Sequence, residues 1–236
     1  MSPSEAMSDI KINLNAEEMA KAGLAFGHNV SRLHPKMKSF VAGVKSNVHL
    51  IDLEKTVKEF ERSLKFISSL VADNKTILFV GTKIQVKNLV KATAQECNMP
   101  YVTERWLGGT FTNFETITKR VLYFKELENK KATGGLEKYT KKERSLFDKE
   151  LEILRKKFEG VKNLSKLPDA VLILDLKKDI TCAKEARRKG IKIIAVADTN
   201  IDPTLADYPI PANDDAISSI SYILEKVKET ILDAKS

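Results

Sequence analysis

A glycine, a threonine and a lysine at positions 81–83 stand where an apolar run, TILFV (76–80), meets a segment with helical spacing. The turn between a strand and the next helix is where doubly wound folds bind phosphate groups, because a helix N-terminus favours an anion. Gly81, Thr82 and Lys83 therefore suit a phosphosugar or a nucleotide. Their spacing matches neither GxxxxGK[ST] nor GxGxxG, so the triplet alone does not define an enzyme.

Side chains that commonly bind metals form no recognisable site in the sequence. The segment DTNID (198–202) begins like a calcium loop, but Pro203 stands where that loop needs glycine and Pro209 where it needs its glutamate. All three histidines lie within the first fifty residues, far in sequence from either cysteine: His28, His34 and His49. Neither GxSxG nor HExxH occurs. We predict no catalytic residue, no cofactor and no metal ion.

The stretch MPYVTERWLGGTFTNF (99–114) contains the only tryptophan of the chain, Trp106. A tryptophan of a protein core normally lies in an apolar run, whereas Trp106 follows Thr-Glu-Arg and precedes Leu-Gly-Gly. This setting is typical of a ligand-binding loop at the end of a strand, or of a docking surface. The residues alone leave both interpretations open.

Composition narrows the class of protein. The chain has 236 residues and is 42% hydrophobic, which is ordinary for a globular protein long enough to bury a core. Its two cysteines belong to no CxxC motif and suit a reducing compartment. No segment reaches the roughly 18 apolar residues that span a membrane, and the N-terminal segment lacks an apolar secretory core. We expect a cytoplasmic protein without a membrane partner.

The formal net charge of +8 is unevenly distributed. Residues 112–166 hold 15 Lys and Arg against 9 Asp and Glu, whereas from residue 169 onward acids outnumber bases by 12 to 10. Between His28 and His49 lie four basic residues and no acid. Concentrated positive charge favours a polyanionic partner, because neutralising phosphates releases counterions. The alternative is that a lysine-rich surface merely keeps the protein soluble.

Alternating apolar runs and helical patterns predict the elements that position these residues. Strands are predicted at 48–53, 76–81, 101–103, 170–175 and 191–198. Helices are predicted at 15–25, from 54 to about 72, at 83–97, at 179–189 and after Asn213, with Asn15 and Asn213 as N-caps and Gly190 as a C-cap. Short strands that alternate with helices form a parallel sheet covered on both faces. We predict an α/β, doubly wound fold of the flavodoxin or Rossmann type.

Residues 113–161 interrupt this alternation, because they contain no predicted strand and are too long for a loop. Their second half carries apolar residues spaced four and three apart, the spacing of a heptad seam: Phe147, Leu151, Leu154, Phe158 and Val161. The first half offers a partner seam: Ile117, Val121, Phe124 and Leu127. We predict an antiparallel coiled-coil hairpin at 113–161, inserted in an α/β body made of residues 1–112 and 162–236.

Six segments in order resemble one known family. They are FGHNVSRLHPKMKSF (26–40), NVHLIDLEKT (47–56), FVGTK (79–83), MPYVTERWLGGTFTNF (99–114), LPDAVLILD (167–175) and IIAVADTNIDPTLADYPIPANDDA (193–216). Together they look like the bacterial-type S-two family, the second protein of the small ribosomal subunit, over essentially the whole chain. Lys45-Ser46-Asn47 replaces a frequent Arg-Asn-Gly of that family, and Asn47 is expected to keep the turn by adopting a positive φ.

The resemblance implies a protein without catalysis that binds ribosomal RNA between the head and body of the small subunit and supports translation. The implied partners are small-subunit RNA and neighbouring ribosomal proteins, including the large mRNA-binding first protein of the bacterial small subunit. No small-molecule substrate is implied. The long hairpin indicates the bacterial or organellar branch. The other class of function is a phosphosugar- or nucleotide-binding enzyme that uses Gly81, Thr82 and Lys83.

On this basis we predict the residues that contact RNA. They are Arg32, Lys36, Lys38, Lys45, Lys83, Arg105, Trp106, Thr110, Asn113, Lys119 and Arg120. The first four lie in the acid-free segment and are expected to contact phosphates, which positions the RNA without reading its sequence. Trp106 either stacks at the RNA face or packs between the hairpin root and the sheet. We favour packing, because a projecting hairpin needs an anchor of large area.

Overall fold

A five-stranded parallel sheet forms the centre of the computed structural model, which describes residues 14–235. Its strands are β4 (Ile77–Val80), β5 (Tyr101–Val102), β6 (Ala170–Ile173), β7 (Lys192–Ala197) and β8 (Tyr208–Pro211). The spatial order is β5-β4-β6-β7-β8, so the direction of winding reverses between β4 and β6. This order is that of flavodoxin-like folds and confirms the predicted doubly wound α/β class.

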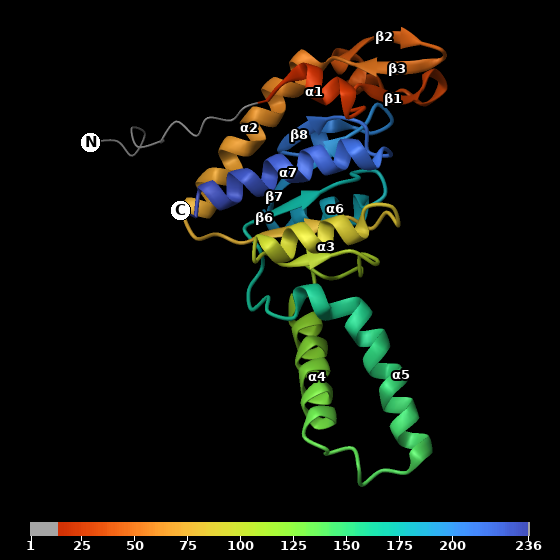
Figure 1. The fold of residues 1–236 in the computed structure, drawn as a ribbon, viewed down its shortest axis with the longest axis vertical. Coiled ribbons are helices and arrows are strands. Elements are labelled where there is room, and N and C mark those ends of the chain that lie inside the picture. The colour runs from red at the N-terminus through yellow and green to blue at the C-terminus, as the bar shows by residue number, and fades with distance from the viewer. Residues whose placement is uncertain (1–13, 236) are drawn as a thin grey trace, which may run out of the picture.

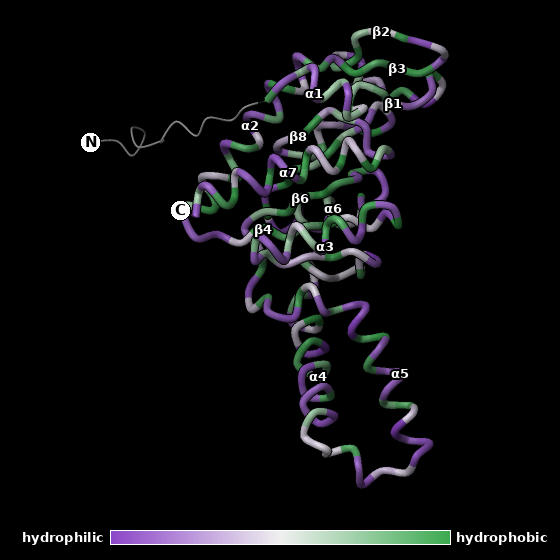
Figure 2. The backbone as a smooth tube through the Cα atoms, in the orientation of Figure 1, coloured by the Kyte–Doolittle hydropathy of each residue, from purple (hydrophilic) through white to green (hydrophobic). Residues whose placement is uncertain are grey.

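Helices cover both faces of the sheet, and alternate strand residues face each layer (Figure 1). The helices of the body are α1 (Ala16–Lys21), α2 (Leu53–Ala72), α3 (Lys87–Glu96), α6 (Ile180–Lys189) and α7 (Ile217–Asp233). Phe79 and Leu172 join the core under α2, α3 and α7, whereas Leu78 and Val171 join the core under α6. All of β4 and β6 is buried, as the apolar runs predict, and Figure 2 shows these strands as hydrophobic segments.

A second, antiparallel sheet lies at one end of the molecule, in the order β1-β3-β2 (Figure 1). Its strands are β1 (Phe26–Asn29), β2 (Val41–Lys45) and β3 (Val48–Ile51), and the 3₁₀ helices η1 (Val30–Arg32) and η2 (Pro35–Phe40) connect β1 to β2. The turn between β2 and β3 places Ser46 at φ 49° and Asn47 at φ 64°, which confirms the expected positive φ of Asn47. Only β3 was predicted from the sequence.

Two long helices, α4 (Phe114–Ala132) and α5 (Lys141–Phe158), extend away from the body at the opposite end (Figure 1). We call them the arm. Their predicted seam residues are buried in, or packed against, one apolar cluster that continues to the sheet. Ion pairs also link the two helices, with Lys131 2.7 Å from Asp148 and Arg155 2.9 Å from Glu128. The 3₁₀ helix η3 (Glu159–Val161) follows α5 and packs against β5, and the chain then continues to β6.

Two helix starts and one strand differ notably from the sequence prediction. The helix expected from residue 83 begins at Lys87, after a turn. The last helix begins at Ile217, because the side chain of Asn213 accepts hydrogen bonds from the N–H groups of Asp215 and Ala216 and caps a turn ahead of it. Strand β8 was not predicted, since its sequence YPIP contains two prolines. Among residues 14–235, no helix is long and apolar enough to cross a membrane.

Candidate functional site

Lys83 lies at the point where the winding of the sheet reverses, which is where this fold normally binds a ligand. Its Nζ is 2.9 Å from Asp175, just after β6, 2.7 Å from Asp214 and 2.8 Å from Asp215. The same ammonium donates to the Asp214 carbonyl at 2.7 Å. Burial acts to lower the pKa of Lys83, but hydrogen bonds to its three carboxylate partners outweigh burial and raise it. Lys83 is therefore charged and fully engaged inside the protein.

The rest of the Gly81-Thr82-Lys83 turn is also committed to the fold. The Thr82 hydroxyl donates to Asp179 at 3.0 Å, and burial raises the pKa of Asp179 to about 6 despite that bond. A Cβ on Gly81 would lie 2.7 Å from a methyl group of Val90, so glycine is needed for the approach of helix α3. The turn is thus closed by side chains of the chain itself, which disfavours a phosphate ligand.

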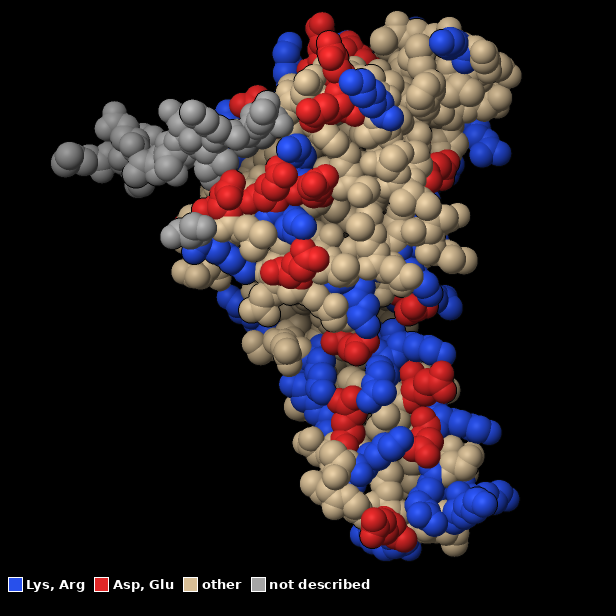
Figure 3. All heavy atoms as spheres, viewed as in Figure 1, with Lys and Arg blue, Asp and Glu red and all other residues tan. Residues whose placement is uncertain are grey.

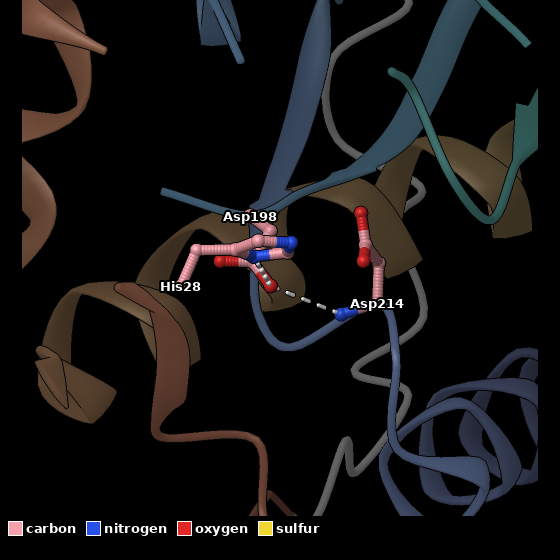
Figure 4. A group of neighbouring side chains, drawn as sticks. All are labelled: His28, Asp198 and Asp214. Carbon is pink, nitrogen blue, oxygen red and sulfur yellow. Dashed lines mark hydrogen bonds and ion pairs between the residues drawn. The ribbon is translucent and has the colours of Figure 1, made fainter. Parts of the chain in front are cut away.

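His28 joins this network from β1. Its Nδ1 is 3.0 Å from Asp198, which follows β7, and its Nε2 is 3.4 Å from Asp215. Figure 4 shows the His28 ring against Asp198, with the carboxylate of Asp214 on its other side. The hydrogen bond to Asp198 raises the pKa of His28, although burial opposes that effect. We call Lys83, His28 and their four aspartates, Asp175, Asp198, Asp214 and Asp215, the carboxyl-edge cluster.

Glu185 of α6 organises the loop that contains the tryptophan. Its carboxylate accepts hydrogen bonds from the N–H groups of Gly109 at 2.7 Å and Phe111 at 3.0 Å, and from the Trp106 indole at 3.4 Å. Burial acts to raise the pKa of Glu185, but these backbone hydrogen bonds outweigh burial and lower it. Gly109 adopts φ 94°, a conformation that favours glycine. The loop is therefore pinned to the body by one buried carboxylate.

Trp106 packs at the root of the arm. Its side chain is 7% exposed and meets Phe111 edge-on, with ring centroids 4.8 Å apart. It belongs to the same apolar cluster as Val121 and Phe124 of α4. This is the packing geometry that we favoured. Nearby, Thr110 is buried and its hydroxyl donates to the Leu107 carbonyl.

The exposed residues among those predicted to contact RNA form two groups on the surface. Arg32, Lys36, Lys38 and Lys45 lie in or beside the antiparallel sheet, and all four are exposed. Arg105, Lys119 and Arg120 are exposed at the root of the arm and on α4, next to the exposed Asn113. Figure 3 shows Lys and Arg side chains over the arm, interspersed with acids. Eight of the eleven predicted residues thus lie on two exposed surfaces, whereas Trp106 and Thr110 are buried and Lys83 is held by carboxylates.

A basic cleft of about 280 Å³ at the root of the arm was not predicted from the sequence. It lies between α3, β5 and α5, and its basic lining residues are Lys87, Lys91, Arg105, Arg155, Lys156 and Lys157. Three glutamates line it as well and pair with several of these cations. Segments that lie 50 residues apart build this cleft, so local charge runs in the sequence do not reveal it.

These observations define a doubly wound α/β protein whose usual ligand crevice is closed by ion pairs and whose exposed predicted contact residues form two separate surfaces. The sequence profile of the family described as ribosomal protein S2 matches residues 19–234. The chain belongs to this family of structural, non-enzymatic proteins, which confirms the resemblance seen in the sequence. The alternative of a phosphosugar- or nucleotide-binding enzyme is not supported.

Curated relatives agree along nearly the whole length. The protein named small ribosomal subunit protein uS2 of Endomicrobium trichonymphae is 42% identical over 95% of this chain and 92% of its own length. Those of Dictyoglomus thermophilum and Thermus thermophilus are each 43% identical, over 93% and 95% of this chain and 89% and 88% of their own lengths. The segments that carried the resemblance therefore belong to a similarity that spans both the sheet and the arm.

Proposed function

We propose that this chain is a structural constituent of a bacterial-type small ribosomal subunit, where it binds ribosomal RNA and supports translation without catalysing a reaction. The observation that carries this proposal is the family match over residues 19–234, with relatives named as small-subunit proteins. The closed crevice at Lys83 supports a role in which the sheet is a scaffold and the outer surfaces bind.

The RNA-binding surfaces of the proposal are the two exposed basic regions. Because they lie at opposite ends of the molecule (Figure 1), one copy can contact two separate RNA segments. This arrangement fits a position between the head and the body of the subunit, which the family resemblance implies. Lys38, Lys45 and Arg105 form no ion pair with any residue of the described range 14–235. These three side chains can therefore bind RNA phosphates without first breaking an ion pair inside the protein.

Lys83 and Trp106, also among the predicted RNA contacts, have a different part in this proposal. Three carboxylates hold Lys83, and the ring of Trp106 is packed in the apolar cluster at the arm root. Both residues support the surfaces that bind, one by fixing the strand edge and the other by fixing the loop beside Arg105. Thr110 also fixes the loop beside Arg105, because its hydroxyl donates to the Leu107 carbonyl.

We propose that residues 113–161, which contain the arm, are an insert in a body made of 1–112 and 162–236. The arm has two kinds of surface. Its basic side chains suit RNA, whereas Leu122, Leu146 and Ile153 are more than half exposed and suit an apolar protein surface. Neighbouring ribosomal proteins supply such partners, and the resemblance points to the mRNA-binding first protein of the subunit as one of them.

Deletion of residues 118–160 with a short glycine bridge tests this proposal. The α/β body should remain folded by circular dichroism, but it should incorporate poorly into small subunits during reconstitution and should be lost in a moderate-salt wash. A second variant keeps the arm and replaces Lys119, Arg120 and Lys142 with Gln, which separates the charge of the arm from its shape. Equal incorporation of the deleted and parent proteins would show that the arm is dispensable.

A further inference from the structure

The basic cleft at the arm root holds two cations that the protein itself does not pair. Three of its lysines, Lys87, Lys91 and Lys156, lie 2.9–3.0 Å from glutamates of the same cleft. Arg105, after β5, and Lys157, on α5, also line the cleft and are exposed. Neither forms an ion pair with a residue that the structure describes. The cleft therefore offers an anion two unpaired cations from two different elements.

A second hollow, of about 550 Å³, opens beside this cleft. It is lined by residues that precede β4, β5 and β6, and by the end of α3. The two hollows share Tyr101, Glu159 and Gly160, so they meet where η3 packs against β5. A Cβ on Gly160 would lie 2.5 Å from the Tyr101 ring, so glycine is what allows this close approach. A ligand with two chemically different parts can therefore occupy both hollows at once.

Polar, uncharged side chains line this second hollow, which we call the amide hollow. Asn98, Asn163 and Ser165 are exposed there. None of these three side chains makes a hydrogen bond to another residue of the described range 14–235. A side-chain amide presents two donors and an acceptor, which match the edge of a nucleobase that is not already in a base pair. The amide hollow is therefore suited to an unpaired base.

The two hollows together select among polyanions. Tyr101 is 8% exposed and η3 lies on its ring, so a base at this place is recognised through its polar edge and not by stacking. A fully paired duplex would reach the cations alone, since its base edges are engaged with each other. An acidic peptide would likewise supply anions and no base. An RNA strand with an unpaired nucleotide supplies a phosphate and a free base edge side by side.

We propose that the cleft and the amide hollow together bind one unpaired nucleotide of an RNA strand. Arg105 and Lys157 hold its phosphate, and Asn98 and Asn163 hold the edge of its base. This inference rests on the RNA-binding role proposed above and adds that the arm root prefers RNA with an unpaired nucleotide. Because α5 and the segment after β5 both line the cleft, such a nucleotide would also fix the arm against the body.

The test uses the full-length protein and RNA hairpins of equal length in fluorescence anisotropy titrations. One hairpin is fully paired, and four others carry a single bulged A, C, G or U. We expect the parent to bind at least one bulged hairpin about tenfold more tightly than the paired one, which is the effect of one or two added hydrogen bonds. A parent that binds all five hairpins equally would overturn the proposal, and this measurement needs no variant.

Variants then locate the preference on the protein. Asn163→Ala is combined with Asn98→Gly, because Asn98 has φ 49° and glycine keeps that backbone. This double variant should bind every hairpin as the parent binds the paired one. Asn129→Ala with Asn74→Gly is the matched control, since both residues are exposed outside the two hollows and Asn74 has φ 54°. The control should keep the full preference, and its loss there would place the site elsewhere.

The cations are tested separately by Arg105→Gln with Lys157→Gln. This variant should bind all five hairpins more weakly, with a salt dependence flattened by up to about one unit per lost phosphate contact. An unchanged salt dependence would remove the cleft from the site. Binding of the parent to small-subunit RNA is measured in the same salt series. A parent that binds this RNA without preferring a bulge overturns this inference alone, whereas a parent that binds neither this RNA nor the hairpins overturns the proposed function as well.

Discussion

At the carboxyl edge of the parallel sheet, the Lys83 ammonium is 15% exposed and lies between carboxylates of which two are almost fully buried. On the arm, Lys119 and Glu115 form an ion pair of similar length, 3.0 Å, but their side chains are 72% and 83% exposed. Removing one partner of a buried pair leaves an uncompensated charge, whereas an exposed pair contributes little. The comparison teaches that charge at the sheet edge maintains the fold, while charge on the arm is available to partners.

The largest effect is expected from Lys83→Met, which leaves Asp175 and Asp214 without their buried cation. We expect a loss of about 3–5 kcal/mol in the free energy of unfolding, measured by urea denaturation. Lys119→Met removes the same charge from the exposed pair and should cost less than about 0.5 kcal/mol. Equal stability of the two variants would show that the buried ion pairs at the sheet edge stabilise the fold no more than the exposed ion pair on the arm.

Glu185→Gln tests a buried charge that acts through backbone hydrogen bonds. We expect a loss of about 1.5–3 kcal/mol near pH 7, because Trp106, Gly109 and Phe111 lose a charged acceptor. The folded protein lowers the pKa of Glu185, so its contribution exists above the unfolded pKa and disappears as the pH falls through the folded value.

The difference between this variant and the parent should therefore shrink at acidic pH in urea titrations. Glu126→Gln, at an exposed position on the arm, is the control and should match the parent at every pH. A pH-independent loss in Glu185→Gln would show that side-chain shape, not charge, holds the loop.

Gly160→Ala tests how the arm joins the sheet. A Cβ at Gly160 would lie 2.1 Å from the carbonyl oxygen of Tyr101, so η3 has to move away from β5. We expect a loss of about 1–3 kcal/mol in thermal or chemical denaturation, the range for overpacked sites. Gly108→Ala is the matched control, since a Cβ there has no neighbour within 4 Å. If both variants melt like the parent, the junction is looser than the structure shows.

Only a small change in stability per residue is expected when Arg32, Lys36, Lys38 and Lys45 are all replaced by Ala. Each side chain is exposed, and the one ion pair among them, Lys36 with Asp202, is 55% exposed on its lysine side. Each replacement should alter stability by less than about 0.5 kcal/mol. The dependence of RNA affinity on salt should nevertheless flatten by up to about one unit per lost phosphate contact. An unchanged slope would exclude this region from the RNA interface.

Much of the fold was predictable because strands buried on both faces are continuous apolar runs. Ile77–Val80 and Ala170–Ile173 were found in this way, and Gly190 was recognised as a C-cap that adopts φ 70°. Strands β1 and β2 were missed, since FGHN and VAGVK contain no buried residue and carry no clear alternation. The edge strand β8 was missed because prolines argue against a central strand.

The carboxyl-edge cluster was not predicted, because five separate segments contribute its members. A signal did exist: Asp175 and Asp198 each follow a buried parallel strand, and the carboxyl ends of such strands meet at one edge. What the sequence could not supply was the place of His28, which depends on the unpredicted strand β1. Glu185 was missed for a similar reason, since its main partners are backbone N–H groups, which leave no side-chain pattern in the sequence.

The two outer strands of the parallel sheet have a consequence for how the protein behaves before it meets RNA. At β8 the N–H of Ala212 donates to β7, so by alternation the backbone nitrogens of Pro209 and Pro211 face away from the sheet. Proline has no N–H to donate there. The Thr56 hydroxyl of α2 donates to the Pro211 carbonyl, which is therefore already bonded. At β5 the return of the arm at Gly160 lies directly against Tyr101. Neither margin can accept an additional strand, which is the usual route to fibrillar aggregation. The parallel sheet therefore offers other copies of the chain no open edge for strand pairing.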